Sequence, residues 1–161
     1  MKQHPLADQS LEPEQYRIVV DFKAPIEACF KAGTAEEAMM VWVPNIKSVE
    51  YDHTKAAVPY GAGSFRHVRM NGGVAVVERV LVSQPPTLLI YSIEANAFVN
   101  NHVLRNYRGF MHFAPLASNE TRLTWVGHFA STPLLRPLAR TVIRGMIRTF
   151  ATRMSGYLTR Q

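Results

Sequence analysis

The sequence contains little cysteine and no long apolar run. Cys29 is the single cysteine among 161 residues, which excludes an internal disulfide. It lies in PIEACFKAG, the pattern of a short amphipathic helix, and we expect a small buried side chain rather than a reactive thiol. No segment approaches the roughly 18 apolar residues of a transmembrane helix, and MKQHPLADQSLEPEQ has no signal-peptide core. We therefore expect a cytoplasmic protein.

Motifs of nucleophilic catalysis and metal binding are missing as well. Neither G-x-S-x-G nor a Walker-type loop is present, and Ser64 and Ser92 have no evident His–Asp partners. His112 and His128 lie on neighbouring predicted strands, but both alternate with apolar residues that we expect to face inward. A metal site needs three or four converging ligands. We predict no metal and no cofactor, and a solvated position for His53.

Acidic residues are absent from the last quarter of the chain. Residues 1–120 carry 11 basic and 12 acidic side chains, whereas residues 121–161 hold seven arginines and no acid. Four of these are spaced by four along a predicted helix, namely Arg136, Arg140, Arg144 and Arg148. A solvated helix face is the simplest interpretation, and weak contact with an anionic membrane is the alternative. The interleaved aromatic residues of a single-strand binder are missing, so no nucleic-acid partner is predicted.

The order of predicted elements indicates one α+β domain over residues 15–161, preceded by a flexible tail over residues 1–14. The predicted strands cover residues 16–25, 46–54, 63–70, 74–83, 87–95, 102–115 and 121–131. Two short helices over 25–34 and 35–44 follow the first strand, and a long amphipathic helix begins near residue 135. Strands joined by hairpins predict an antiparallel sheet, on which the long helix must bury its apolar stripe. A curved sheet around one helix can enclose a pocket.

The stretch GSFRHVRMNGGVAVVERV predicts a hairpin that contains an opposed charge pair. With a three-residue loop over 71–73, Arg66 faces Glu78 and Val68 faces Val76. One inward face then holds Arg66, Val68, Met70, Val74, Val76, Glu78, Val80 and Val82. A two-residue loop would put the two charges on opposite faces, and we favour the first register because it leaves neither charge alone in the core. The pair is then either a polar anchor in a ligand cavity or a structural salt bridge at its rim.

Several segments together resemble the START-like superfamily, also called SRPBCC, and within it the polyketide cyclase/dehydrase and lipid-transport group. The resemblance covers residues 16–160 and depends on Trp42-Val43-Pro44, Gly63 with Arg66, Glu78, Pro85-Pro86, Tyr107 and Trp125. It implies a helix-grip fold, in which a seven-stranded antiparallel sheet wraps around the C-terminal helix and encloses a hydrophobic cavity. It implies no single activity, because related proteins bind lipids, sterols, polyketides or plant hormones, and some catalyse cyclisation or dehydration.

We therefore predict a protein that binds a hydrophobic small molecule, a lipid, polyketide or aromatic compound, between sheet and helix. The predicted ligand-binding residues are Arg66, Val68, Met70, Val76, Glu78, Tyr91, Tyr107, Met111, Trp125, Met146 and Phe150. One alternative is a polyketide cyclase or aromatase, with Glu78 as general acid or base and Arg66 stabilising an enolate. Another is a lipid-handling module that docks on anionic membrane through the arginine helix. Monomer and homodimer both remain open.

Overall fold

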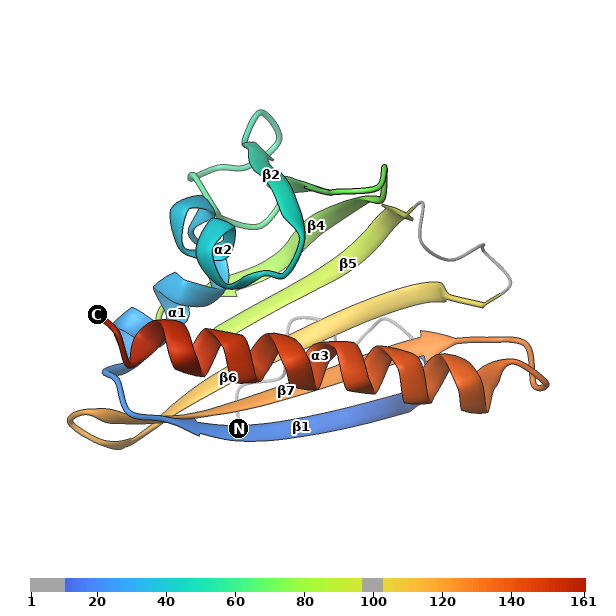
Figure 1. The fold of residues 1–161 in the computed structure, drawn as a ribbon. Helices are drawn as coiled ribbons and strands as arrows, with labels where there is room; N and C mark the ends of the chain where they lie inside the picture. The colour runs from blue at the N-terminus through green and yellow to red at the C-terminus, as the bar shows by residue number, and fades with distance from the viewer. Residues whose placement is uncertain (1–10, 97–102) are drawn as a thin grey trace.

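The computed structural model describes residues 11–96 and 103–161, which contain a seven-stranded antiparallel sheet and three helices. The strands are β1 (Glu14–Phe22), β2 (Ile46–Asp52), β3 (Phe65–Met70), β4 (Ala75–Gln84), β5 (Leu88–Asn96), β6 (Arg105–Ala117) and β7 (Glu120–Ala130). The helices are α1 (Ile26–Thr34), α2 (Glu36–Trp42) and α3 (Arg136–Leu158). The strand order is β1-β7-β6-β5-β4-β3-β2, so the first and last strands of the chain lie side by side. The predicted α+β helix-grip fold is confirmed (Figure 1).

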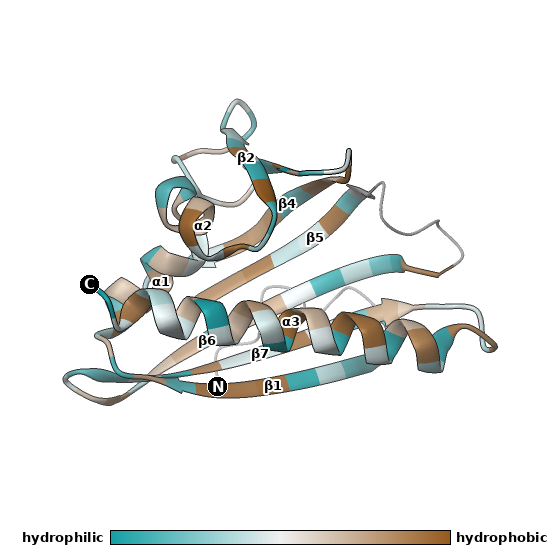
Figure 2. Cartoon of the chain, viewed as in Figure 1, coloured by the Kyte–Doolittle hydropathy of each residue, from teal (hydrophilic) through white to brown (hydrophobic). Residues whose placement is uncertain are grey.

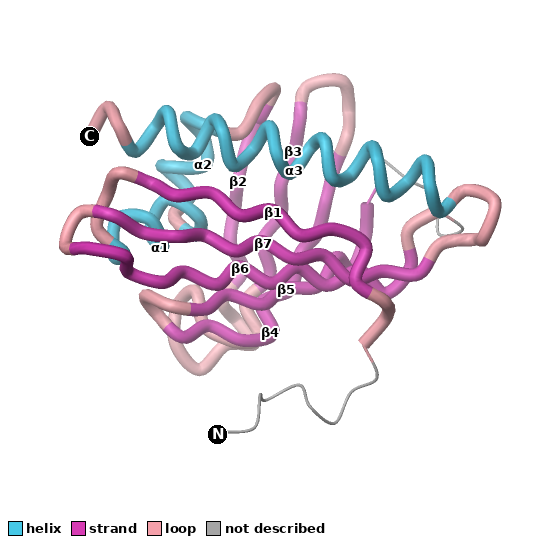
Figure 3. Tube along the Cα trace, turned by 90° about the horizontal axis from the view of Figure 1, so that it is seen from below, coloured by secondary structure: helices cyan, strands magenta, loops and turns pink. Residues whose placement is uncertain are grey.

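Helix α3 crosses the open side of the curved sheet. It packs on β1 and against α1 and α2, which lie at the end where the C-terminus is found (Figures 1 and 3). Pro137 lies in its first turn, where the missing N–H has no helical partner to lose. Its buried residues recur every three or four positions, at Ala139, Ile143, Ile147, Ala151, Met154 and Leu158. Figure 2 shows polar and apolar residues in turn along the ribbon of α3. The buried positions lie on one side of the helix, and this apolar stripe packs on the sheet.

Several smaller predictions can be placed in this fold. Cys29 is fully buried, and burial raises the pKa of its thiol, in agreement with an unreactive side chain. Strand β1 begins at Glu14, and the carbonyl of Glu12 accepts a hydrogen bond from His128 Nδ1 at 2.8 Å. Most of the predicted tail, residues 1–10, lies outside the described residues, as does His102, so the tail stays a prediction. No helix in the described part of the chain combines the length and apolarity needed to cross a bilayer.

The β3–β4 hairpin has the predicted register. Arg66 pairs with Glu78 and Val68 with Val76, and the N–H of Met70 donates to the carbonyl of Val74 at 2.8 Å across the loop. Gly72 and Gly73 both have positive φ, at 86° and 85°, which glycine adopts without strain.

The expectation that Val82 shares the inward face is wrong. The β4–β5 register shifts between Val80 and Val82, because a bulge there turns the strand over. Val82 therefore packs beside Ile90 in a separate small cluster, while Val80 stays in the main core.

Two glycines of the sheet lie directly beneath the rings of two tyrosines on neighbouring strands. Tyr91, Gly109, Gly127 and Tyr16 are successive partners across β5, β6, β7 and β1. A Cβ at Gly109 would lie 2.3 Å from the Tyr91 ring, and one at Gly127 would lie 2.1 Å from the ring of Tyr16. The absence of both side chains lets the rings lie flat on neighbouring strands. Glycine here sets the direction of the two phenol groups.

We predict that Gly109→Ala lowers the free energy of unfolding by about 1–3 kcal/mol, because the new methyl group displaces the Tyr91 ring. The matched control is Gly145→Ala, an exposed helix position where a Cβ meets nothing within 4 Å. There the helix preference of alanine should raise stability by up to about 1 kcal/mol. Urea unfolding measures both changes, and a Gly109→Ala protein as stable as wild type would contradict the packing role of this glycine.

Candidate functional site

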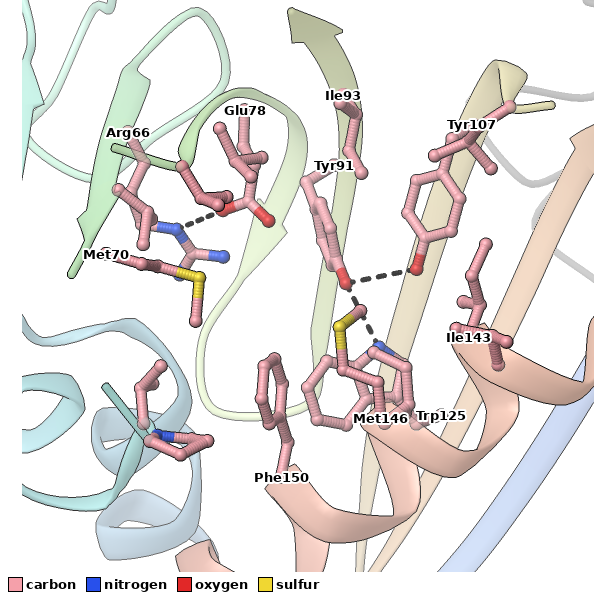
Figure 4. Close-up of a pocket in the computed structure, with 18 of the residues that line it drawn as sticks. Arg66, Met70, Glu78, Tyr91, Ile93, Tyr107, Trp125, Ile143, Met146 and Phe150 are labelled. Atoms are coloured by element: carbon pink, nitrogen blue, oxygen red, sulfur yellow. Dashed lines mark hydrogen bonds and ion pairs between the residues drawn. The ribbon is translucent and has the colours of Figure 1, made fainter. Parts of the chain in front are cut away.

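A cavity of about 500 Å³ lies between the inner face of the sheet and α3. Strands β3 to β7 line one side, α3 lines the other, and residues of α1, α2 and the segment after α2 close one end (Figure 4). The lining is mostly apolar, and its charged groups are the side chains of Arg66 and Glu78. A volume of this size is typical of a small-molecule pocket rather than of a packing defect.

The predicted residues converge on this cavity. Its lining includes Arg66, Val68, Met70, Val76, Glu78, Tyr91, Tyr107, Met111, Trp125, Met146 and Phe150. That these side chains contact a ligand stays a prediction. The lining residues that the sequence interpretation missed include Gly33 of α1, Met39 and Trp42 of α2, Val43 directly after α2, and the α3 residues Ile143 and Ile147. The apolar spacing of α3 indicates the last two, whereas no local pattern shows which end of the cavity the short helices close.

Arg66 and Glu78 form a buried ion pair at the end of the cavity near α1 and α2. Arg66 Nε donates to Glu78 Oε2 at 2.5 Å, and the side chains are 7% and 13% exposed. Their opposition follows from the hairpin register, which places the two residues directly across from each other on the inner face. A buried charge is tolerated in such a position only when it is paired and hydrogen-bonded.

The Arg66 guanidinium is held from a second side. Its Nη1 donates to the carbonyl of Gly33 at 3.2 Å, to Met39 Sδ at 3.2 Å and to Tyr51 Oη at 3.3 Å. Burial disfavours the charged form, but the carboxylate of Glu78 and the oxygen of Tyr51 outweigh it, so the pKa of Arg66 is raised and the group stays charged. The guanidinium thereby ties the hairpin to α1 and α2.

Two polar atoms of the pair have no partner within residues 11–96 and 103–161. Arg66 Nη2 and Glu78 Oε1 make no hydrogen bond there, and both side chains line the cavity (Figure 4). The pair therefore offers one donor nitrogen, with two N–H bonds, and one acceptor oxygen, without a net charge. Chemically, Nη2 can donate to an oxygen of a bound molecule and Oε1 can accept a proton or a hydrogen bond.

Three tyrosines and a tryptophan form the other polar group of the site. Tyr16 and Tyr107 are hydrogen-bonded through their hydroxyl groups, and the hydroxyl groups of Tyr107 and Tyr91 lie 3.5 Å apart. Trp125 Nε1 donates to Tyr91 Oη at 3.2 Å. Burial raises the pKa of each of these tyrosines well above its ordinary value, so all three phenols are neutral. Tyr16 was not predicted from the sequence, because its position against Gly127 depends on the pairing of the two chain ends.

The rim of the cavity includes exposed apolar residues of α3. Leu138 and Val142 are 65% and 49% exposed and belong to the lining. Arg140 and Arg144 each follow one of them by two residues, which places the arginines about 160° away around the helix. All four arginines of the line are exposed, and Arg140 and Arg144 lie on the side of α3 away from Leu138 and Val142. Contact with an anionic membrane stays a prediction.

His53 lies in a polar contact rather than free in solvent. It is half-buried, its Nδ1 lies 3.0 Å from Ser64 Oγ, and the N–H of Tyr60 donates to the same nitrogen at 3.3 Å. The expected solvated position is therefore only partly correct, since His53 lies just after β2 as a half-buried side chain. Ser64 is fully buried outside the cavity lining, and no carboxylate among the described residues bonds to His53, so the pair does not form a catalytic triad.

A curved seven-stranded antiparallel sheet closed by a long C-terminal helix, with two short helices after the first strand, defines the helix-grip class of START-like domains. The chain belongs to the polyketide cyclase/dehydrase and lipid transport family, whose model matches residues 14–159. The resemblance seen in the sequence is thus confirmed. No curated protein matches the sequence significantly.

Solved structures share the fold at low sequence identity. XoxI from Bacillus cereus has a TM-score of 0.70 at 18% identity, covering 89% of this chain and 94% of that one. A START superfamily protein from Mycobacterium smegmatis has a TM-score of 0.72 at 14% identity, covering 90% and 97%. Norcoclaurine synthase from Thalictrum flavum, in complex with dopamine and hydroxybenzaldehyde, has a TM-score of 0.68 at 10% identity, covering 91% and 86%.

We predict that Glu78→Leu lowers the free energy of unfolding by about 3–5 kcal/mol, because it leaves Arg66 charged and unpaired in an apolar interior. The double variant Arg66→Met/Glu78→Leu should recover most of this loss, since no charge then remains buried. Urea unfolding of both single variants and the double variant gives the coupling between the two residues.

The control for this cycle is the exposed pair Asp21–Arg122, whose side chains are 48% and 46% exposed. Arg122→Gln should change stability little, because solvent screens that pair. If the losses at positions 66 and 78 simply add in the double variant, the two side chains are not coupled as the geometry requires.

Proposed function

We propose that the protein binds one hydrophobic small molecule in the cavity between the sheet and α3. The observation that carries this proposal is an apolar cavity of about 500 Å³ whose charged residues form one internally neutralised pair. Removal of apolar ligand surface from water supplies the driving force, at roughly 25 cal/mol per Å² less the cost of association. The paired charges and the phenol groups give the bound molecule an orientation.

Methionine and aromatic residues support the same proposal. Met70, Met111 and Met146 line the cavity together with Tyr91 and Phe150. Methionine side chains are flexible and polarisable, so they adapt to ligands of different shape. We therefore expect a tolerant apolar site, in which the polar end of the ligand determines selectivity more than the shape of its apolar part.

Binding of the neutral apolar dye N-phenylnaphthylamine tests this proposal. We expect its fluorescence to rise on addition of the protein, and Val76→Phe to weaken dye binding at least about tenfold because the ring fills cavity space. Val77→Phe is the matched control, since its side chain does not line the cavity. Equal dye binding by both variants, or no binding to wild type, would contradict the proposal.

A second candidate function is a cyclase or dehydratase acting on a polyketide-like substrate. The unpartnered Oε1 of Glu78 in the cavity supports it, because a carboxylate oxygen with no other partner can take up a proton from a bound substrate. Arg66 Nη2 would then stabilise the resulting enolate oxygen.

Conversion of a poly-β-ketone thioester analogue, followed by mass spectrometry, distinguishes catalysis from binding. If the protein is an enzyme, Glu78→Gln should lower turnover by about a hundredfold or more while dye binding persists. Undiminished turnover in that variant removes Glu78 from the chemistry. No turnover by wild type leaves ligand binding as the function.

A further inference from the structure

The tyrosine–tryptophan cluster holds one more proton than its own contacts use. Tyr16, Tyr91, Tyr107 and Trp125 carry four O–H or N–H protons, and three contacts join them in a row. Each contact uses one proton, so one is left over. These four polar atoms make no other hydrogen bond within residues 11–96 and 103–161.

The surplus proton must lie at the cavity. Tyr16 is buried outside the lining, and its hydroxyl has Tyr107 as its single described partner. If Tyr107 donated, the proton of Tyr16 would be buried without an acceptor among the described residues, so we assign Tyr16 as the donor to Tyr107. Trp125 can only donate, and it donates to Tyr91. The residues at both ends of the row, Tyr16 and Trp125, thus act as donors to the two inner tyrosines. The one that remains belongs to Tyr91 or Tyr107, and both of these line the cavity.

The bond directions also limit which group the cluster can bind. If Tyr107 donates to Tyr91, the oxygen of Tyr91 accepts two hydrogen bonds and its own proton is free. If Tyr91 donates to Tyr107, the oxygen of Tyr107 accepts two and its own proton is free. In both arrangements the hydroxyl group with the free proton can only donate, because its oxygen already accepts two hydrogen bonds. Successive donation along the row polarises this O–H and strengthens the bond that it makes.

The ion pair disfavours a charged ligand in the same cavity. Glu78 already compensates the charge of Arg66, so a carboxylate entering the cavity would bring an unpaired negative charge into an apolar site. A bound anion at Arg66 is therefore not the arrangement that the ground-state geometry favours. An uncharged oxygen meets a donor at the phenols and another at Arg66 Nη2.

We propose that the ligand is an uncharged hydrophobic carbonyl compound whose oxygen accepts a hydrogen bond from the Tyr91–Tyr107 pair. This inference rests on the proposed ligand-binding function and specifies its substrate class. A carbonyl oxygen matches the surplus donor because it accepts a hydrogen bond and brings no proton of its own. The tyrosine pair determines specificity, while Arg66 and Glu78 exclude anions.

Prodan, a neutral dimethylaminonaphthalene with a propionyl group, is a suitable probe because hydrogen bonding to its carbonyl shifts its emission to the red. We expect protein-bound Prodan to emit as it does in an alcohol, and to bind about three- to tenfold more tightly than its propyl analogue, which lacks the carbonyl. The corresponding naphthoate should bind at least about tenfold more weakly than Prodan.

The variant Tyr91→Phe/Tyr107→Phe removes both hydroxyl groups and keeps both rings. We expect the preference for Prodan over the propyl analogue to fall and the emission to move to the blue. Tyr157→Phe is the control, a half-buried tyrosine of α3 outside the cavity lining, and should change neither. An unchanged preference in the double variant overturns the assignment to this pair.

The wild-type protein alone also decides the question if the double variant does not fold. Bound Prodan that emits as in an aprotic solvent, or binding of the naphthoate as tight as that of Prodan, overturns the inference. If Prodan and its propyl analogue bind equally, the cavity binds apolar molecules but the carbonyl assignment is wrong. If none of the three probes binds, the proposed function itself fails.

Discussion

The closed ion pair between Arg66 and Glu78 is the interaction on which the rest of the site depends. It is a buried charge pair in a cavity whose other lining is mostly apolar, and its guanidinium also bonds to the carbonyl of Gly33 and to Tyr51. The pair therefore connects the β3–β4 hairpin to the helices that close the cavity. It also leaves the interior electrically neutral, and this neutrality limits the chemistry of anything that binds there.

A second constraint comes from backbone positions without side chains. Gly109 and Gly127 leave room for the rings of Tyr91 and Tyr16 to lie across neighbouring strands, so that hydroxyl groups from three strands meet near Trp125. The neutral phenols and the neutralised charges thus form two polar groups on an apolar wall. An apolar molecule can enter at low cost, and the polar groups give it one orientation.

Local patterns were sufficient to predict the element order, the antiparallel sheet and the hairpin register, because a one-residue slip would have separated Arg66 from Glu78. Local patterns were insufficient where the position of a side chain depends on contacts between segments that are far apart in the sequence. Tyr16 joins the phenol row because β1 pairs with β7, the other end of the chain. The bulge that turns Val82 outward has no signal in an unbroken run of apolar residues. His53 is partly buried because Ser64, which directly precedes β3, returns to it.

The most direct test of the central claim is to locate a bound apolar molecule by nuclear Overhauser effects. With N-phenylnaphthylamine added to isotope-labelled protein, we predict contacts from the dye to the methyl groups of Val76 and Met146, which line the cavity from the sheet and from α3. Contacts confined to the exposed surface residues Leu116 and Leu134, with none to Val76 or Met146, would contradict an internal binding site.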